Sequence, residues 1–350
     1  MRERIADLLH RAGALQALMK VRAFAPFPTL SIVTYHNIAD HELTFPHPEV
    51  IDATPKQFRR QMEMLARHCT PVAIDDLVRA LDGAPLPKNA VMVTFDDGYA
   101  SCHDVALPVL QQLGIPATFF IATSFVEERR LYWWERVALL VAGATKRGRI
   151  TYPHTLELLP RDAATRRRLD DIIKDTPNLD VDRFLSEIAH ALGVPWTPEL
   201  EAERTRGLIM TWDQVRALAA AGMDVESHSR SHRVLQTLEP DELRAELAGS
   251  RADLEARIGK KVRAIAYPVG RRVGRRARWI REALTQAGYL LGLTNASGVN
   301  RIWPGSMRRM MPFDPFDVHR LSLDRSISDA MFLTQIALPR FAYIGRHEPD

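Results

Sequence analysis

Apolar runs that fit buried strands recur along the chain, and most are followed by a helical pattern. Apolar and β-branched residues run from Thr29 to Thr34, from Ala90 to Phe95 and from Ala117 to Ala122, without polar residues at every second position. Such runs are typical of parallel strands that helices cover on both faces. The alternation predicts an α/β fold, either a barrel or a doubly wound sheet.

Helix signals separate these strands. Thr54-Pro55 fits an N-cap residue followed by proline, and Thr211 to Gln214 has the form of a capping box. Gly114, Gly222 and Gly288 follow apolar helical patterns and are expected to end them. Further helices are predicted at residues 74–81, 105–113, 239–258 and 275–287, and further strands at 223–227, 262–266 and 289–294.

The rhythm of strand and helix stops near residue 124 and returns near residue 210. The residues between are charged and mostly helical in pattern, which predicts a helical insertion at about 126–209. Trp133 and Trp134 near its start either stack on a sugar ring or belong to its core. Residues 1–28 are expected to hold an amphipathic helix with a basic polar face, which either packs on its own domain or rests on an anionic membrane surface.

Composition narrows the class of protein. Hydrophobic residues make up 46% of the chain and charged residues 26%, as in an ordinary globular protein. The net charge of +4 is too small for a nucleic-acid-binding surface, so no nucleic acid partner is expected. No apolar run approaches the ~18 residues of a membrane span, and the charged N-terminal residues lack a secretory layout. We expect a cytoplasmic protein, with peripheral contact at the inner face of the membrane as an extension.

Polar side chains follow several predicted strands directly. Asp96, Asp97 and Gly98 end the strand that begins at Ala90, and His36 follows the first strand. The carboxyl ends of strands are where α/β folds bind their ligands. The Asp-Asp-Gly sequence is equally compatible with simple turn chemistry.

The strongest metal-binding pattern combines one of these aspartates with two histidines. His228 and His232 are separated by three residues and could point at one position if the segment turned helically. Asp97 from another strand end would complete a three-ligand set that leaves positions open for water and substrate, as catalytic metal sites do. The alternative is that both histidines are loop residues with local hydrogen bonds.

Three motifs resemble those of the polysaccharide deacetylases, also called the NodB-homology domain or carbohydrate esterase family 4. The first motif is Thr94-Phe95-Asp96-Asp97-Gly98, and the second runs from His228 to His232 as His-Ser-Arg-Ser-His. The third runs from Ile265 to Gly270 in the Ala-Tyr-Pro form of a subgroup. The resemblance implies a distorted (β/α) barrel at residues 29–345, interrupted by the insertion, with the site at the strand ends.

The resemblance also implies roles for the residues of the first two motifs. Asp96 would be the general base, while Asp97, His228 and His232 would hold a divalent metal ion, most often zinc. Two adjacent carboxylates suit this division, because the metal keeps one ionised while the other accepts a proton from water. Their mutual repulsion would raise the pKa of Asp96 unless a cation lies beside it.

Two features depart from the family pattern. Ala266 stands where many members have an arginine that holds the base, and Arg309 or Arg320 are our candidates to replace it. The later histidine that acts as general acid has no clear counterpart, and His36 is our candidate. The third motif is expected to contact substrate, with the backbone N–H of one residue stabilising the oxyanion. These substrate-binding residues are Tyr267, Pro268 and Val269, and the N–H is that of Val269.

The implied activity is hydrolysis of the N-acetyl amide of an amino sugar, within a polysaccharide, an oligosaccharide or a lipid-linked glycan precursor. A deformylase or O-acetyl esterase of the same family is one alternative, and an inactive carbohydrate-binding protein is another. The arginine-rich run at 271–281 is either a solvated face or a contact for the phosphates of a lipid-linked sugar.

Overall fold

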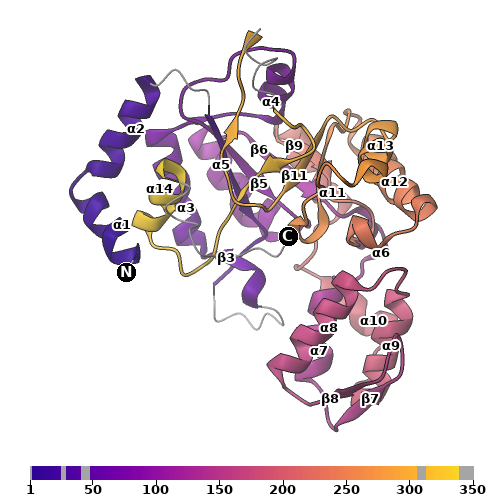
Figure 1. Ribbon diagram of the computed structural model, residues 1–350. Coiled ribbons are helices and arrows are strands. Elements are labelled where there is room, and N and C mark those ends of the chain that lie inside the picture. Colours follow the sequence, from indigo (N-terminus) through magenta and orange to yellow (C-terminus); the bar gives the residue numbers. More distant parts are fainter. Residues whose placement is uncertain (1, 25–28, 41–47, 306–312, 339–350) are drawn as a thin grey trace.

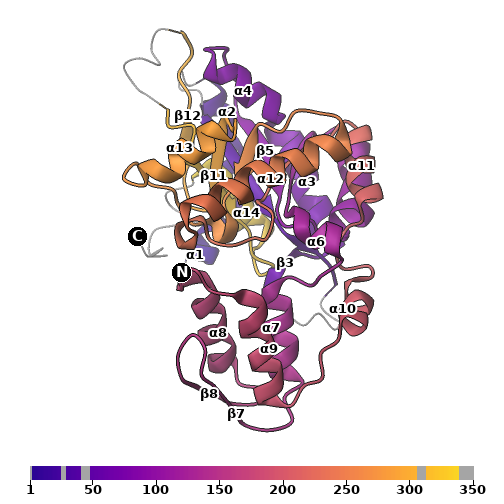
Figure 2. The same cartoon turned by 90° about the vertical axis from the view of Figure 1, so that its right-hand side faces the viewer.

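A curled sheet forms the centre of the protein, and helices cover its outer side (Figure 1). The computed structural model describes residues 2–24, 29–40, 48–305 and 313–338. A second, smaller lobe of mostly helices lies beyond one end of the sheet (Figures 1 and 2). This arrangement confirms the predicted α/β class and the distorted barrel with a mostly helical insertion.

Within the described residues, ten strands make up the main sheet. They are β1 (Thr29–Tyr35), β4 (Thr70–Pro71), β5 (Ala90–Phe95), β6 (Ala117–Ile121), β9 (Asp224–Ser227), β10 (Ala264–Ala266), β11 (Leu291–Thr294), β12 (Asn300–Arg301), β13 (Val318–His319) and β14 (Leu321–Ser322). The main path runs β12, β1, β5, β6, β9, β10, β11, β13. Of its described pairings, that of β1 with β12 is antiparallel and the others are parallel. The strand predictions are therefore confirmed, with β10 and β11 each starting two residues later than expected.

One short segment joins the two ends of the curled sheet. β13 pairs in parallel with β11 at one end of the main path, and β14 pairs in parallel with β1, the second strand from the other end. Arg320 is the residue between these two strands. Residues 318–322 therefore form the seam of the barrel, and Arg320 lies in the middle of it.

Aromatic side chains fill the space between the sheet and α3 (Pro55–His68). The ring of Phe95 on β5 stacks on Phe119 at 4.6 Å and on Tyr35 at 5.6 Å between centroids. Phe58 of α3 meets Tyr35 edge to face at 5.2 Å. All four rings are buried, and such offset and edge contacts are the favoured geometries of aromatic pairs. This packing fixes β5, and with it the position of Asp96 and Asp97 at its end.

Capping residues set the ends of the outer helices, as the sequence predicts. Thr54 forms a capping box at the start of α3, and Thr211 forms another at the start of α11. Gly114 ends α5 in the left-handed conformation with a φ of 63°. The other helices of the barrel are α4 (Ile74–Leu81), α5 (Leu107–Leu113), α6 (Thr123–Glu128), α11 (Trp212–Ala220), α12 (Pro240–Ile258), α13 (Arg278–Gln286) and α14 (Asp329–Ala337).

The smaller lobe is formed by the residues predicted as an insertion. It is mostly helical, as the pattern indicates, with four helices, and it also contains a two-stranded hairpin that the pattern does not reveal (Figure 2). Strands of three residues are too short to give a recognisable alternation. The elements are α7 (Trp133–Ala142), β7 (Gly148–Ile150), β8 (Leu156–Leu158), α8 (Ala163–Asp175), α9 (Val181–Leu192) and α10 (Pro198–Thr205).

A buried hydrogen-bond chain fixes the lobe to the barrel. The hydroxyl of Tyr99, two residues after Asp97, donates to Oε1 of Glu135 on α7 at 2.8 Å. The same hydroxyl accepts from Nε1 of Trp134 at 2.9 Å. Buried polar groups that satisfy one another in this way favour a single arrangement of the elements that carry them. The lobe is therefore held next to the loop that follows β5.

The N-terminal segment forms two helices rather than one. α1 (Arg2–Arg11) and α2 (Ala14–Phe24) are separated at Gly13, whose φ of 70° interrupts the helix. α1 packs on α14, where the hydroxyl of Ser328 donates to Oε2 of Glu3 at 2.7 Å. These contacts favour packing on the protein's own domain, so the membrane contact stays a prediction. Among the described helices, none has the length and hydropathy that crossing a membrane requires.

Candidate active site

One cavity of about 260 Å³ lies at the carboxyl ends of the parallel strands. Loops after β1, β5, β9, β10 and β11 form most of its wall, and the smaller lobe forms the rest. Residues that are far apart in the sequence meet here because parallel strands present all their carboxyl ends at one end of a barrel. The barrel contributes His36, Val50, Asp96, Asp97, His228, His232, Val269, Gly270 and Asn295, and the lobe contributes Trp133, Trp134, Asp170 and Lys174.

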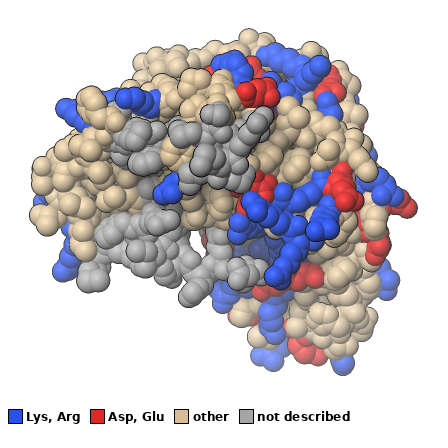
Figure 3. Space-filling view, turned by 45° about the horizontal axis from the view of Figure 1, so that its top comes forward, with Lys and Arg blue, Asp and Glu red and all other residues tan. Residues whose placement is uncertain are grey.

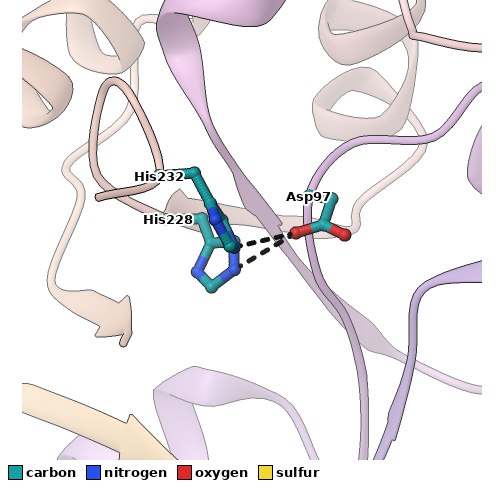
Figure 4. A group of neighbouring side chains, drawn as sticks. All are labelled: Asp97, His228 and His232. Atoms are coloured by element: carbon teal, nitrogen blue, oxygen red, sulfur yellow. Dashed lines mark ion pairs between the residues drawn. The ribbon is translucent and has the colours of Figure 1, made fainter. Parts of the chain in front are cut away.

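Asp97, His228 and His232 converge, as the sequence predicts (Figure 4). Oδ1 of Asp97 lies 3.3 Å from Nε2 of His228 and 3.4 Å from Nε2 of His232. One ligand atom from each residue lies within 4.8 Å of the others, and all three side chains are buried. Oδ1 of Asp97 receives no well-aligned hydrogen bond from the described residues. Two imidazoles and a carboxylate around an unsatisfied oxygen fit a divalent metal ion.

The protonation states of this group also suit a metal. Burial raises the pKa of Asp97, but His228 and His232 outweigh it, and the net pKa lies far below its usual range. Burial lowers the pKa of His232, although Asp97 opposes the change. Metal ligands must be ionised carboxylates or neutral imidazoles, so neither residue has to change its state before binding an ion.

The two histidines meet on an irregular loop, not on the helical turn that their spacing suggested. Ser229 and His232 both adopt the left-handed conformation, with φ values of 61° and 54°. The hydroxyl of Ser229 accepts the backbone N–H of His232 at 3.2 Å, and Ser227 accepts that of Ser229 at 3.1 Å. These hydrogen bonds stabilise the left-handed turns that bring the imidazoles together.

The orientation of His228 depends on the third motif. Nδ1 of His228 lies 2.8 Å from the carbonyl oxygen of Ala266. A carbonyl can only accept, so Nδ1 carries a proton and Nε2 is the ring nitrogen that faces Asp97. Hydrogen bonds of this kind fix the ring of a metal-binding histidine. Ala266 thus contributes through its backbone, whichever side chain it has.

Arg320 holds Asp96 from the seam of the barrel. Its Nη1 and Nη2 each donate to one carboxylate oxygen of Asp96 at 2.7 Å, and both side chains are at most 1% exposed. Burial raises the pKa of Asp96, but Arg320 and His228 lower it to a net value below its usual range. Of our two candidates for this cation, Arg320 occupies the position, and Arg309 lies outside the described residues. Asp96 is therefore ionised beside the ligand group.

His36 enters the same cavity as a cation. Its Nδ1 lies 3.1 Å from Oδ2 of Asp52, which also accepts the backbone N–H of His36. Burial alone would lower the pKa of His36, but Asp52, with smaller contributions from Asp97 and Asp96, raises it to about 10. Asp52 lies on β3 (Ile51–Ala53), which pairs with β2 (Asn37–Ile38) next to the barrel. Sequence reasoning missed Asp52, because this pairing is not visible in the local pattern.

Only part of the third motif reaches the cavity. Val269 lines it, with a φ of 53° that is unusual for a β-branched residue. Gly270 also lines it, and a Cβ atom there would lie 2.3 Å from Cβ of Asn295, so no other residue fits. Tyr267 and Pro268 are not among the described residues that line the cavity. The hydroxyl of Tyr267 donates to the carbonyl of Phe316, so its substrate contact stays a prediction.

The two tryptophans of the insertion have different surroundings. Trp134 is buried against the ring of His232 at 4.6 Å and is stacked on Tyr132 at 4.5 Å, so it is chiefly a core residue. Trp133 lines both this cavity and a second one of about 260 Å³, whose other lining residues come from the lobe and the barrel. Because Trp133 lines both cavities, the sugar contact stays a prediction for this residue.

The arginine-rich run at 271–281 is largely used within the protein. Arg272 forms two hydrogen bonds to Asp317 through Nε at 2.8 and 3.0 Å, and Arg281 binds Asp314 at 2.9 Å. Basic side chains gather on one face of the molecule with acidic side chains among them (Figure 3). The ion pairs hold residues 271–277 in a loop, which explains why α13 begins three residues later than predicted. Phosphate binding by this run stays a prediction.

The cavity combines groups that can carry out acid and base catalysis. It contains an ionised carboxylate on Asp96, a cationic imidazole on His36 and a ligand group for a divalent ion. Oδ2 of Asp96 lies 4.0 Å from Nε2 of His228, so Asp96 is adjacent to the three residues that could hold an ion. Such a set, at the strand ends of a parallel barrel, is typical of an α/β-barrel hydrolase.

Comparison with known families agrees with the motifs. The sequence profile described as polysaccharide deacetylase matches residues 83–291, which is more than half of the chain. The chain therefore belongs to the polysaccharide deacetylase family. Asp96, Asp97, His228 and His232 all lie within the matched residues.

The chain is also similar to two enzymes named poly-beta-1,6-N-acetyl-D-glucosamine N-deacetylase. It is 30% identical to the one from Staphylococcus epidermidis over 74 residues, which are 21% of this chain and 26% of that protein. It is 31% identical to the one from Escherichia coli K12 over 97 residues, which are 27% of this chain and 14% of that protein. The matched part thus spans about a quarter or less of each relative.

A solved structure supports the fold over most of the chain. The deacetylase PplD of Streptococcus pyogenes, in complex with acetate, superimposes with a TM-score of 0.58. The match covers 89% of this chain and 100% of that chain at 18% identity. At this identity the likeness establishes the fold alone.

Proposed function

We propose that this protein hydrolyses the N-acetyl amide of an amino sugar in a polysaccharide or oligosaccharide, and that it does so with a divalent metal ion. The observation that carries the proposal is the convergence of Asp97, His228 and His232 beside an ionised Asp96 in one cavity. The similarity to N-deacetylases of poly-β-1,6-N-acetylglucosamine makes an oligomer of that sugar the first substrate to test.

Asp97, His228 and His232 would hold the ion, and zinc is our proposed metal. When bound, such an ion polarises the amide carbonyl and lowers the pKa of a bound water molecule. Asp96 accepts the proton of the attacking water in this proposal. Arg320 supports that role in two ways, because it keeps the carboxylate ionised and fixes both oxygens in one plane.

His36 is the proposed general acid. An amide nitrogen leaves as an amine only after it gains a proton, and His36 carries one at neutral pH. Asp52 fixes the ring through Nδ1, so the other ring nitrogen, Nε2, is the donor available to the cavity. The backbone N–H of Val269 remains our proposed contact for the oxyanion.

The substitution Asp96→Asn tests the proposal. We expect N-acetyl hydrolysis to fall by roughly 10²–10⁴-fold, because the amide cannot accept the proton. Metal content should stay the same, since Asp96 is not one of the three ligands. Asp82→Asn is the matched control, because Asp82 is exposed at the end of α4 and is not among the residues that line the cavity. A fully active Asp96→Asn protein would show that the assignment of the base is wrong.

Paired amide and ester substrates test the alternatives. Cleavage of O-acetyl but not N-acetyl sugars would show that the protein is an esterase. Cleavage of N-formyl sugars alone would show that it is a deformylase. Sugar binding without hydrolysis of any of them would support an inactive binding protein. A lipid-linked sugar as substrate and a cytoplasmic location at the membrane face stay predictions, which cell fractionation can test.

A further inference from the structure

We propose that the smaller lobe recognises the sugar and that Asp170 on α8 binds hydroxyl groups of the ring that carries the acetamide. This inference rests on the proposed deacetylation. It gives the insertion a task that the three motifs do not supply, since the metal and acid–base groups all come from the barrel.

Asp170 is a buried acid in the wall of the cavity at the strand ends. It lines the same cavity as Asp96 and Asp97, and it is only 7% exposed. Its Oδ1 is buried and has no hydrogen-bond partner among the described residues. Buried carboxylate oxygens nearly always have donors, so an oxygen without one at the edge of a cavity indicates that a ligand supplies the donor.

Two further unsatisfied polar atoms belong to residues of the same wall. Nε1 of Trp133 on α7 and Oδ1 of Asn295 after β11 are buried without a hydrogen-bond partner among the described residues. With Asp170 they offer one donor and two acceptors from three different elements. A sugar ring suits this set, because each hydroxyl both donates and accepts while the apolar ring face can pack on an indole.

Lys174 is a basic residue in the same cavity wall as Asp170, and its charge bears on which ligand can bind there. It lies one helical turn after Asp170 on α8, lines the same cavity and places its Nζ 5.8 Å from the ring centre of Trp133. The free amine of a deacetylated sugar would be cationic and would be repelled by Lys174. A hydroxyl carries no charge and meets no such penalty. Asp170 would attract the same ammonium, so the two side chains together give it no net attraction, and the neutral hydroxyls of the ring suit the pair.

Both ends of α8 are held in place. Asp162 caps the start of the helix by accepting the backbone N–H of Thr165 at 2.7 Å. At the other end, Arg271 from the loop after the third motif binds Asp175 and donates to the carbonyl of Lys174. The helix that carries Asp170 is thus tied to the barrel beside the cavity. A fixed helix is the kind of support that a recognition residue needs.

The test compares Asp170→Asn with Asp171→Asn, because Asp171 is the exposed next residue of the same helix. Three substrates are used: an N-acetylglucosamine oligomer, the same oligomer with one ring hydroxyl replaced by hydrogen, and an aryl acetate without a sugar. For Asp170→Asn we expect kcat/KM to fall at least tenfold more on the oligomer than on the aryl acetate, mainly through KM. Asp171→Asn should stay within twofold of the unmodified protein on all three.

Deoxy substrates examine the same contact without altering the protein. At one ring position, loss of the hydroxyl should lower kcat/KM of the unmodified protein but have little further effect on Asp170→Asn. Equal losses of Asp170→Asn on the oligomer and the aryl acetate would show a structural role and overturn the inference. The inference would also be overturned if the unmodified protein hydrolysed every deoxy substrate with the same kcat/KM as the parent oligomer. This outcome can be read even if the Asp170→Asn protein does not fold.

A binding measurement separates this inference from the proposed function. In the Asp96→Asn background, calorimetry with the intact oligomer should show at least tenfold weaker binding when Asp170→Asn is added. Weaker binding together with no hydrolysis by the unmodified protein would overturn the deacetylase proposal and leave the recognition by Asp170 standing. Unchanged binding together with active hydrolysis would overturn only the inference.

Discussion

The substitution Arg320→Met tests whether one buried ion pair holds the proposed base. Arg320 is fully buried and binds Asp96 through two hydrogen bonds of 2.7 Å. Methionine fills a similar volume but carries no charge. The substitution therefore leaves the carboxylate of Asp96 buried beside Asp97 without its cation.

The structure indicates a large effect. Removing one partner of a buried ion pair typically costs about 3–5 kcal/mol, because the remaining charge stays buried and unpaired. The same substitution in an Asp96→Asn background leaves no such charge, so its cost should be smaller by about 2–3 kcal/mol, within the range measured for coupled neighbours. Activity should also fall sharply, since the base loses both its orientation and its neighbouring charge.

Urea unfolding of the four metal-free proteins, followed by tryptophan fluorescence, measures these free energies. Midpoints and slopes are compared across the unmodified protein, both single variants and the double variant. The reasoning is refuted if Arg320→Met costs the same with Asp96 or Asn at position 96. That result would mean that Arg320 stabilises the seam by packing and not through the ion pair.

Two further predictions concern metal and pH. Zinc at 100 times its dissociation constant should stabilise the unmodified protein by about 2.7 kcal/mol, measured by thermal melting. It should have little effect on the Asp97→Ala protein. If zinc stabilised both proteins equally, the ion would bind at another site. Burial raises the pKa of Glu226 to about 8, although hydrogen bonds from the backbone N–H groups of Ala264 and Arg263 oppose the change. This carboxyl therefore stabilises the folded protein fully below about pH 4.5, and the stabilisation is lost as the pH rises to 8. The free energy of unfolding should fall by at most about 1.4 kcal/mol per pH unit over this range. In urea titrations, Glu226→Gln should show a shallower decline over this range, and an equal decline would contradict the assignment.

The barrel and the convergence of Asp97, His228 and His232 could be predicted from the sequence because their signals are local. Each apolar strand is followed directly by its polar residues, and parallel strands bring those residues to one end. The geometry at His228 and His232 differed in detail, since a loop with left-handed residues replaced the expected helical turn. The two histidines still converge with Asp97, because their meeting point is set by the ends of the strands and not by the shape of the loop.

The supporting residues could not be predicted in the same way. Asp52 reaches His36 through a small two-strand pairing, and Asp170 and Lys174 reach the cavity through the packing of the lobe. No spacing in the sequence encodes these contacts. Arg320 was one of two candidates because its position depends on which strands the seam joins, and that register is set by tertiary packing.

The seam gives the alignment of Asp96 a particular vulnerability. β13 and β14 have two residues each, so few backbone hydrogen bonds hold Arg320 between its neighbours. Local fraying of residues 318–322 would withdraw the guanidinium while the longer strands stayed paired. Such a molecule would keep most of its folded structure, but the carboxylate of Asp96, the proposed base, would no longer be held in its orientation. Amide hydrogen exchange in this short stretch is therefore a direct report on what fraction of the molecules is competent for catalysis.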